Sequence, residues 1–127
     1  MTHSRDDLVQ YRLERAFESL AEAKTMASAN HWNACLNRLY YCCFYAVSAL
    51  LLKNDLSSSK HSGVHSLFNR HFVKTGKVPK TLARAYRDFF ELRREGDYVD
   101  LVQFTESDVA PMIPLAEDFL KHIAGLI

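Results

Sequence analysis

The chain has 127 residues, of which 48% are hydrophobic and 24% are charged. This composition is typical of a soluble globular domain and excludes a chain that is too short or too polar to bury a core. We therefore expect one domain over residues 1–127. Four glycines and three prolines are few for this length and indicate long helices joined by short turns.

The first helix is expected over residues 5–29, and the sequence after it predicts a helical hairpin. Apolar side chains recur at helical spacing from Leu8 to Met26, with charged residues between them. Asn30 and His31 interrupt the pattern, and a second helical stretch follows directly. Two long helices joined by so short a turn pack against each other antiparallel.

The second, central helix is expected over Trp32–Lys53, with the rest of the chain packed around it. From Leu39 to Leu52 it has no charged residue, and apolar residues on every side are typical of a buried helix. Asn30 is expected to cap its start. A membrane span is the alternative, but the uncharged run is shorter than the roughly 20 residues that a bilayer requires. We therefore expect no membrane partner.

All three cysteines, Cys35, Cys42 and Cys43, lie in this central helix. Helix geometry opposes a disulfide between any two of them, so we expect reduced core thiols rather than a redox pair or a metal site. The segment Met1–Asp7 is polar and charged, unlike a signal peptide. These features predict a cytoplasmic protein, and no cofactor or metal is expected.

Two further helices are expected in the middle of the chain. After a polar loop, apolar residues at helical spacing predict a helix over residues 61–74, and Gly76 suits the position just past its end. Pro79 is favourable at the first position of the next helix, because its missing N–H would have no partner there.

The last helix is expected from residue 105 to about residue 124. Thr105 and Asp108 have the spacing of a capping box. Pro111 and Pro114 predict an irregular course before Pro114. The fold class that follows is all-α, an antiparallel up-and-down bundle of four long helices plus a shorter one.

The net charge of +1 hides a strong asymmetry along the chain. Residues 60–95 contain nine basic and three acidic side chains, whereas residues 96–127 contain one basic and six acidic side chains. The basic block could attract a polyanion. It could equally pair with the acidic C-terminal segment, within one subunit or across a dimer.

Arg38 is the one charged residue of the central helix before its last residue, Lys53, and Tyr41 and Tyr45 follow Arg38 at helical spacing on the same face. A buried guanidinium requires carboxylate or carbonyl partners, because burying it unpaired costs several kcal/mol. Arg38 is therefore either a member of a structural ion pair or the lining of a functional groove.

His61 and His65 stand four residues apart, a spacing that could ligate a metal. No third ligand is evident, so we do not predict a zinc site. Instead, Lys60, His61 and the free N–H groups of the first helical turn could meet a phosphate. The alternative is a capped helix start that only contacts solvent.

Several segments of the chain form a recognisable combination. The central helix has Arg38-Leu39-Tyr40-Tyr41-x-x-Phe44-Tyr45-Ala46, then Ala49-Leu50-Leu51. The later segments are Lys60-His61-Ser62-Gly63-Val64, Phe72-Val73-Lys74-Thr75-Gly76, Glu91-Leu92-Arg93-x-x-x-Asp97-Tyr98 and Ala116-x-x-Phe119-Leu120. Together they resemble HEPN domains (higher eukaryotes and prokaryotes nucleotide-binding), in the small bacterial and archaeal branch associated with toxin–antitoxin pairs. The resemblance covers about residues 8–125.

This resemblance implies a helical homodimer, often partnered by a small nucleotidyltransferase antitoxin, and in many members an RNA-cleaving toxin. The family's catalytic motif is an arginine followed a few residues later by a histidine. Arg93 matches the arginine, but Asp97 or Tyr98 occupies the place of the histidine. Because histidine supplies acid and base catalysis near neutral pH and arginine cannot shuttle a proton, we expect a module without catalysis.

The expected function is thus a nucleotide-, RNA- or partner-binding module that acts with a minimal nucleotidyltransferase. Its expected ligand-binding residues are Arg38, Tyr41, Tyr45, Lys60, His61, Arg93 and Tyr98. One alternative is a metal-independent ribonuclease toxin in which Arg93 holds the phosphate and His61, Asp97 or Tyr98 transfers protons. Another is a structural adaptor dimer, in which Arg38 pairs with Asp88, Glu91 or Asp97.

Overall fold

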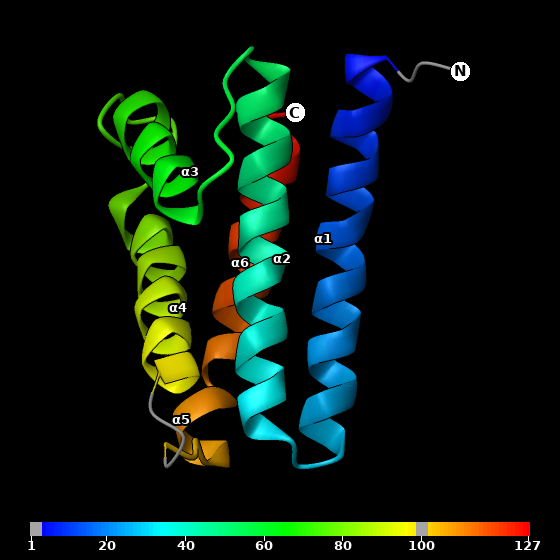
Figure 1. Cartoon of the computed structure of the whole chain (residues 1–127), viewed down its shortest axis with the longest axis vertical. Coiled ribbons are helices and arrows are strands. Elements are labelled where there is room, and N and C mark those ends of the chain that lie inside the picture. The colour runs from blue at the N-terminus through cyan, green and yellow to red at the C-terminus, as the bar shows by residue number, and fades with distance from the viewer. Residues whose placement is uncertain (1–3, 99–101) are drawn as a thin grey trace.

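The computed structural model of the chain is a bundle of helices (Figure 1). It describes residues 4–98 and 102–127, and for residues 94–98 the course of the helix only. The elements in order are α1 Arg5–Ser28, α2 Trp32–Lys53, α3 His61–Phe68, η1 Asn69–Val73, α4 Lys80–Tyr98, α5 Glu106–Val109 and α6 Met112–Gly125. Four of them are long, no strand occurs in the described ranges, and the predicted all-α bundle is confirmed.

The α1–α2 hairpin forms as predicted, with one difference at its turn. Ser4 begins α1 with a capping box, because its hydroxyl accepts from Asp7 N–H while the Asp7 carboxylate accepts from Ser4 N–H. Asn30, expected to cap α2, instead adopts a left-handed conformation with φ 62°, and His31 precedes the helix without a side-chain cap. Asparagine tolerates this conformation better than most residues, which is why the turn is so short.

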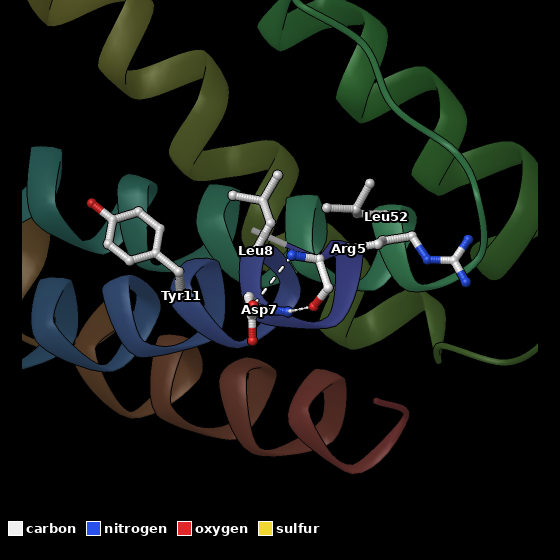
Figure 2. Close-up of a pocket in the computed structure, with 6 residues that line it drawn as sticks. Arg5, Asp7, Leu8, Tyr11 and Leu52 are labelled. Atoms are coloured by element: carbon white, nitrogen blue, oxygen red, sulfur yellow. Dashed lines mark hydrogen bonds between the residues drawn. The ribbon is translucent and has the colours of Figure 1, made fainter. Parts of the chain in front are cut away.

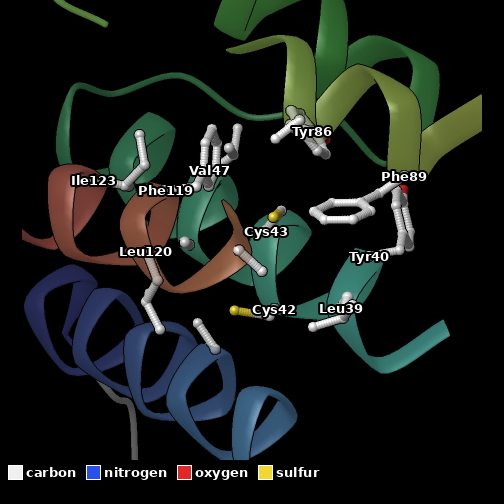
Figure 3. Close-up of a cluster of buried hydrophobic side chains, with 14 of the residues drawn as sticks. Leu39, Tyr40, Cys42, Cys43, Val47, Tyr86, Phe89, Phe119, Leu120 and Ile123 are labelled. Atoms are coloured by element: carbon white, nitrogen blue, oxygen red, sulfur yellow. The ribbon is translucent and has the colours of Figure 1, made fainter. Parts of the chain in front are cut away.

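Helix α2 lies in the middle of the bundle, and α1, α4 and α6 surround it (Figure 1). Figure 3 shows part of the resulting core, where α2 side chains such as Leu39, Cys43 and Val47 meet Phe89 and Phe119. By length and composition α2 could cross a membrane, but 67% of its most apolar window is buried inside the bundle. Burial on that scale is what the core helix of a bundle requires.

The predicted helix over 61–74 changes geometry in its second half. It runs as the α-helix α3 to Phe68 and then widens into the π-helical turn η1 over Asn69–Val73. Gly76 has φ 79°, the left-handed conformation expected past a helix end. Pro79 lies one residue before α4 rather than inside its first turn, and its carbonyl accepts the N–H of Ala83.

The C-terminal segment breaks at Pro111 and is fastened to the hairpin by two contacts. The expected capping box at Thr105 and Asp108 is present and opens the four-residue α5, after which α6 begins. The side chain of Asn33 donates to Val102 O at 3.1 Å and accepts from Phe104 N at 2.8 Å. The two ends of this amide therefore hold the connector before α5 against the start of α2.

Candidate functional site

Two arginines and three aromatic rings from α2, α3 and α4 meet on one side of the central helix. We call this group the arginine–aromatic cluster; its members are Arg38, Tyr40, Tyr41, His61 and Arg93. The Tyr41 ring contacts both guanidinium groups, with Arg38 Cζ at 5.0 Å and Arg93 Cζ at 5.4 Å from its centroid. Contacts of this kind are favourable because the ring faces carry negative potential. The two guanidinium groups therefore both contact the ring of Tyr41.

Arg93 is positioned by two tyrosines from α2. Its Cζ lies 5.0 Å from the Tyr40 ring centroid, and its Nη2 donates to the Tyr41 hydroxyl at 3.3 Å. Its side chain is partly buried. These contacts therefore fix the orientation of the Arg93 guanidinium.

His61, in the first turn of α3, joins the cluster through Tyr40. Its Nδ1 lies 2.7 Å from the Tyr40 hydroxyl, and its ring stacks on Phe44 at a centroid distance of 4.3 Å. When the Tyr40 hydroxyl donates this hydrogen bond, the neutral imidazole carries its own proton on Nε2. The free side of the ring is then a hydrogen-bond donor.

Burial and charge keep this pair in its neutral forms. Burial lowers the pKa of His61 from its ordinary value, and the positive charge of Arg93 lowers it further. Burial raises the pKa of Tyr40, although Arg93 opposes the shift. The site at neutral pH therefore presents a neutral imidazole and a protonated phenol beside two permanent cations, a set that attracts anions.

Arg38 has a different carboxylate partner from those we expected. Its Nη1 lies 3.6 Å from Oε1 of Glu22 on α1, and its Nε and Nη2 donate to the Asn37 side chain at 3.2 and 2.7 Å. The expected partners Asp88 and Glu91 belong to α4 and form no ion pair with Arg38, and the side chain of the third, Asp97, falls outside the described residues. Both Arg38 and Glu22 are partly exposed, so the pair holds Arg38 loosely.

The other expected site residues divide into two groups. Tyr45 lies beside the cluster, with its ring 5.8 Å from that of Tyr41 and Arg15 Cζ 5.4 Å from its centroid. Lys60 is exposed and directly precedes His61, but no contact that defines the cluster involves it. Asp97 and Tyr98 lie on α4, and their side chains fall outside the described residues.

Sequence reasoning missed Tyr40 and the supporting ring of Phe44. Tyr40 is fully buried. It lies two residues after Arg38, a rotation of about 200° around the helix, so in the sequence it looks like an ordinary core aromatic on the side away from Arg38. The signals in the sequence were its position beside Tyr41 and its place, with Phe44, in the segment that resembles the family. Its role became visible only when α3 and α4 were placed against α2.

A pocket of about 720 Å³ lies where the start of α1 meets the end of α2. Figure 2 shows Leu8, Tyr11 and Leu52 in its lining, beside the capped start of α1. Its lining also includes Ser4, Arg5 and Asp7, and none of the expected site residues. The arginine–aromatic cluster, which gathers five expected or newly found polar and aromatic side chains, remains the better candidate for a functional site.

Comparison with known proteins identifies the family. The family model described as HEPN domain matches residues 9–126. A UPF0332 protein of Thermotoga maritima is 47% identical over 98% of this chain and 95% of its own length. Two Methanocaldococcus jannaschii proteins, both named "Putative toxin" (MJ0605 and MJ0142), are 31% and 27% identical over 91% and 86% of this chain, and over 85% and 74% of their own lengths. The chain therefore belongs to the HEPN family.

Proposed function

We propose that this chain is a nucleotide- or RNA-binding HEPN module without catalysis of its own, which acts in a toxin–antitoxin pair with a small nucleotidyltransferase. The observation that carries this proposal is the contact of both Arg38 and Arg93 with the Tyr41 ring. Arginine binds phosphate oxygens through two parallel hydrogen bonds. Aromatic rings beside such cations accept the flat face of a nucleobase.

His61 supports binding more than catalysis. Its Nδ1 is engaged by Tyr40, so its remaining nitrogen is suited to donate one hydrogen bond to a phosphate oxygen. A general base would require an unprotonated nitrogen directed at the substrate. The absence of histidine at positions 97 and 98 agrees with this assignment.

The test is titration of the pure protein with ATP and with a short labelled RNA, beside Arg93→Ala and Arg93→Lys. Loss of a charge-assisted contact should weaken binding about tenfold or more. Lysine should restore it only in part, because it lacks the planar fork. Lys121→Ala on the exposed side of α6 is the control for nonspecific charge. Equal binding by the wild type and Arg93→Ala would exclude the cluster as the binding site.

A metal-independent ribonuclease is the second candidate, and one contact favours it. His61 and Arg93 both contact Tyr40, so a proton-transfer group and a phosphate-binding group lie close together although the motif histidine is missing. Such an enzyme would cleave an RNA pool in the presence of a chelator, and both Arg93→Ala and His61→Gln would abolish cleavage. Cleavage that persisted in His61→Gln would leave Asp97 and Tyr98 as the proton carriers.

The proposed partners are a second copy of the chain and the nucleotidyltransferase. Sedimentation of the pure protein would test the homodimer, and co-purification with a nucleotidyltransferase encoded beside it would test the pair. A dimer that bound neither nucleotide nor RNA would instead favour the structural adaptor. In that case the Arg38–Glu22 pair would serve only to join α1 and α2.

A further inference from the structure

A second positive site lies in a groove between α3–η1 and α4. We call it the α3–α4 groove. Its volume is about 220 Å³, and its lining residues are His65, Asn69, Val73, Lys80, Ala83, Arg84 and Arg87. Lys80, Arg84 and Arg87 follow one another at spacings of four and three residues, so they form one row along α4. At about 1.5 Å per residue this row is about 10 Å long.

In the part of the chain that the structure describes, no acidic side chain after residue 101 forms an ion pair with this row. Among the described residues, the only ion pair that involves one of the three is the long contact of Arg87 with the neighbouring Asp88 at 3.9 Å. The acidic Glu117 of α6 instead pairs with Lys24 of α1 at 3.0 Å. The three cations are all exposed. Of the two readings of the basic block, attraction of a polyanion therefore fits the groove, and pairing within the subunit does not.

One aromatic ring, that of His65, lines the same groove. The His65 ring stacks on Phe90 at a centroid distance of 5.4 Å, and Phe90 in turn lies 6.1 Å from the Tyr40 ring of the arginine–aromatic cluster. Burial lowers the pKa of His65, Arg87 lowers it further, and Glu91 opposes the shift. Glu91 also stands one turn beyond Arg87, so the cationic row ends at Glu91.

We propose that the α3–α4 groove binds consecutive backbone phosphates of single-stranded RNA. A row of cations beside a partly exposed aromatic ring, here that of His65, is the combination that single-strand binding surfaces use, because phosphates meet the charges and a base stacks on the ring. Asn69 adds amide donors to the opposite wall. The RNA assignment rests on the proposed function.

The groove can be tested apart from the cluster. Binding of a labelled single-stranded RNA would be measured by anisotropy over a range of salt concentrations, for wild type, Lys80→Gln, and the triple variant Lys80→Gln/Arg84→Gln/Arg87→Gln. Lys121→Gln makes the same charge change as Lys80→Gln on the exposed surface of α6 and is the matched control. ATP titration of each variant would report on the cluster. All four substituted positions are exposed, so the variants should fold.

Three phosphate contacts should give a log–log salt slope steeper by about 2, since each single-strand phosphate contributes about 0.7. The triple variant should therefore lose this part of the slope and bind RNA about tenfold or more weakly at low salt, with ATP binding unchanged. Lys80→Gln should lose about a third of the groove's contribution to the slope, and Lys121→Gln should lose none of it.

The proposal is overturned if the triple variant binds RNA with the wild-type affinity and salt slope, and this result would leave ATP binding at the cluster untouched. It is also overturned if polyglutamate displaces the RNA from wild type at equal charge concentration, because the groove would then take an acidic polypeptide. RNA binding that survives Arg93→Ala but not the triple variant would support the groove and contradict the proposed role of the cluster.

Discussion

The hydroxyl of Tyr40 and Nδ1 of His61 lie 2.7 Å apart, although the two residues are separated by 21 positions in the chain. This contact ties the middle of α2 to the first turn of α3. The same tyrosine ring supports the guanidinium of Arg93 from α4. One buried side chain therefore fixes the relative positions of three helices at the candidate site.

Removing that hydroxyl should loosen His61 while the core stays packed. We expect Tyr40→Phe to lower the free energy of unfolding by about 1 kcal/mol, the ordinary net value of one hydrogen bond. Urea unfolding measures this loss, and NMR of the imidazole nitrogens should show His61 redistributing between its tautomers. Tyr45→Phe, whose ring is partly exposed, is the matched control. Unchanged imidazole signals in Tyr40→Phe would show that the contact does not form in solution.

Stability should fall as the pH drops below about 6.5, because the pKa values of His61 and His65 are both lowered in the folded chain. At pH values between the folded and unfolded pKa values, the unfolded chain binds more protons than the folded chain, so a fall in pH favours unfolding. The contribution of the two histidines to the free energy of unfolding is thus complete above the unfolded pKa and is lost as the pH falls through the folded pKa values. Thermal unfolding at several pH values measures the slope.

Substituting His65 by Gln should flatten that slope in part. His31, exposed at the α1–α2 turn, provides the control substitution and should leave the slope as it is. A slope that is the same in all three proteins would assign the pH dependence to other groups. His65 faces Arg87, Glu91, Tyr86 and Phe90, so these four side chains must be retained in the comparison.

Gly63 in α3 is expected to tolerate no side chain while Ser58 is opposite it. A Cβ at Gly63 would overlap Ser58 Oγ and would lie 2.9 Å from Ser58 Cβ. Gly63→Ala should therefore displace the loop before α3 and destabilise the chain by about 1–3 kcal/mol. The double variant Gly63→Ala/Ser58→Gly should recover most of this loss. Equal stability of the two variants would mean that some contact other than the one with Ser58 is limiting.

Two phenylalanines provide a matched test of the core. Phe119 on α6 is fully buried against Tyr86 and Phe68, whereas Phe17 on α1 is 49% exposed. Phe119→Ala should lower the free energy of unfolding by about 3–5 kcal/mol, because it leaves a cavity. Phe17→Ala should cost far less. Similar losses in the two variants would place Phe17 in an interface, such as that of the proposed homodimer.

Helical periodicity predicted the fold well, because apolar residues repeat clearly along α1, α2, α4 and α6. It did not predict the π-helical turn after Phe68, which depends on packing rather than on local preference. At the site, Arg38, Tyr41, His61 and Arg93 were chosen from charge, spacing and family resemblance, and the structure brings them together. Arg38 pairs with Glu22 rather than with Asp88 or Glu91, since pairing between helices far apart in sequence depends on how they pack.

The amide of Asn33 has a consequence for how the bundle closes. With one donor and one acceptor on the same short side chain, it makes to Val102 and Phe104 the pair of bonds that a neighbouring strand would make. In this helical bundle, one side-chain amide thus makes the kind of hydrogen-bond pair that joins strands in a sheet, and it holds the segment before α5. Aspartate at this position would keep the acceptor for Phe104 N–H and lose the donor to Val102 O, so one of the two bonds depends on the amide nitrogen of Asn33.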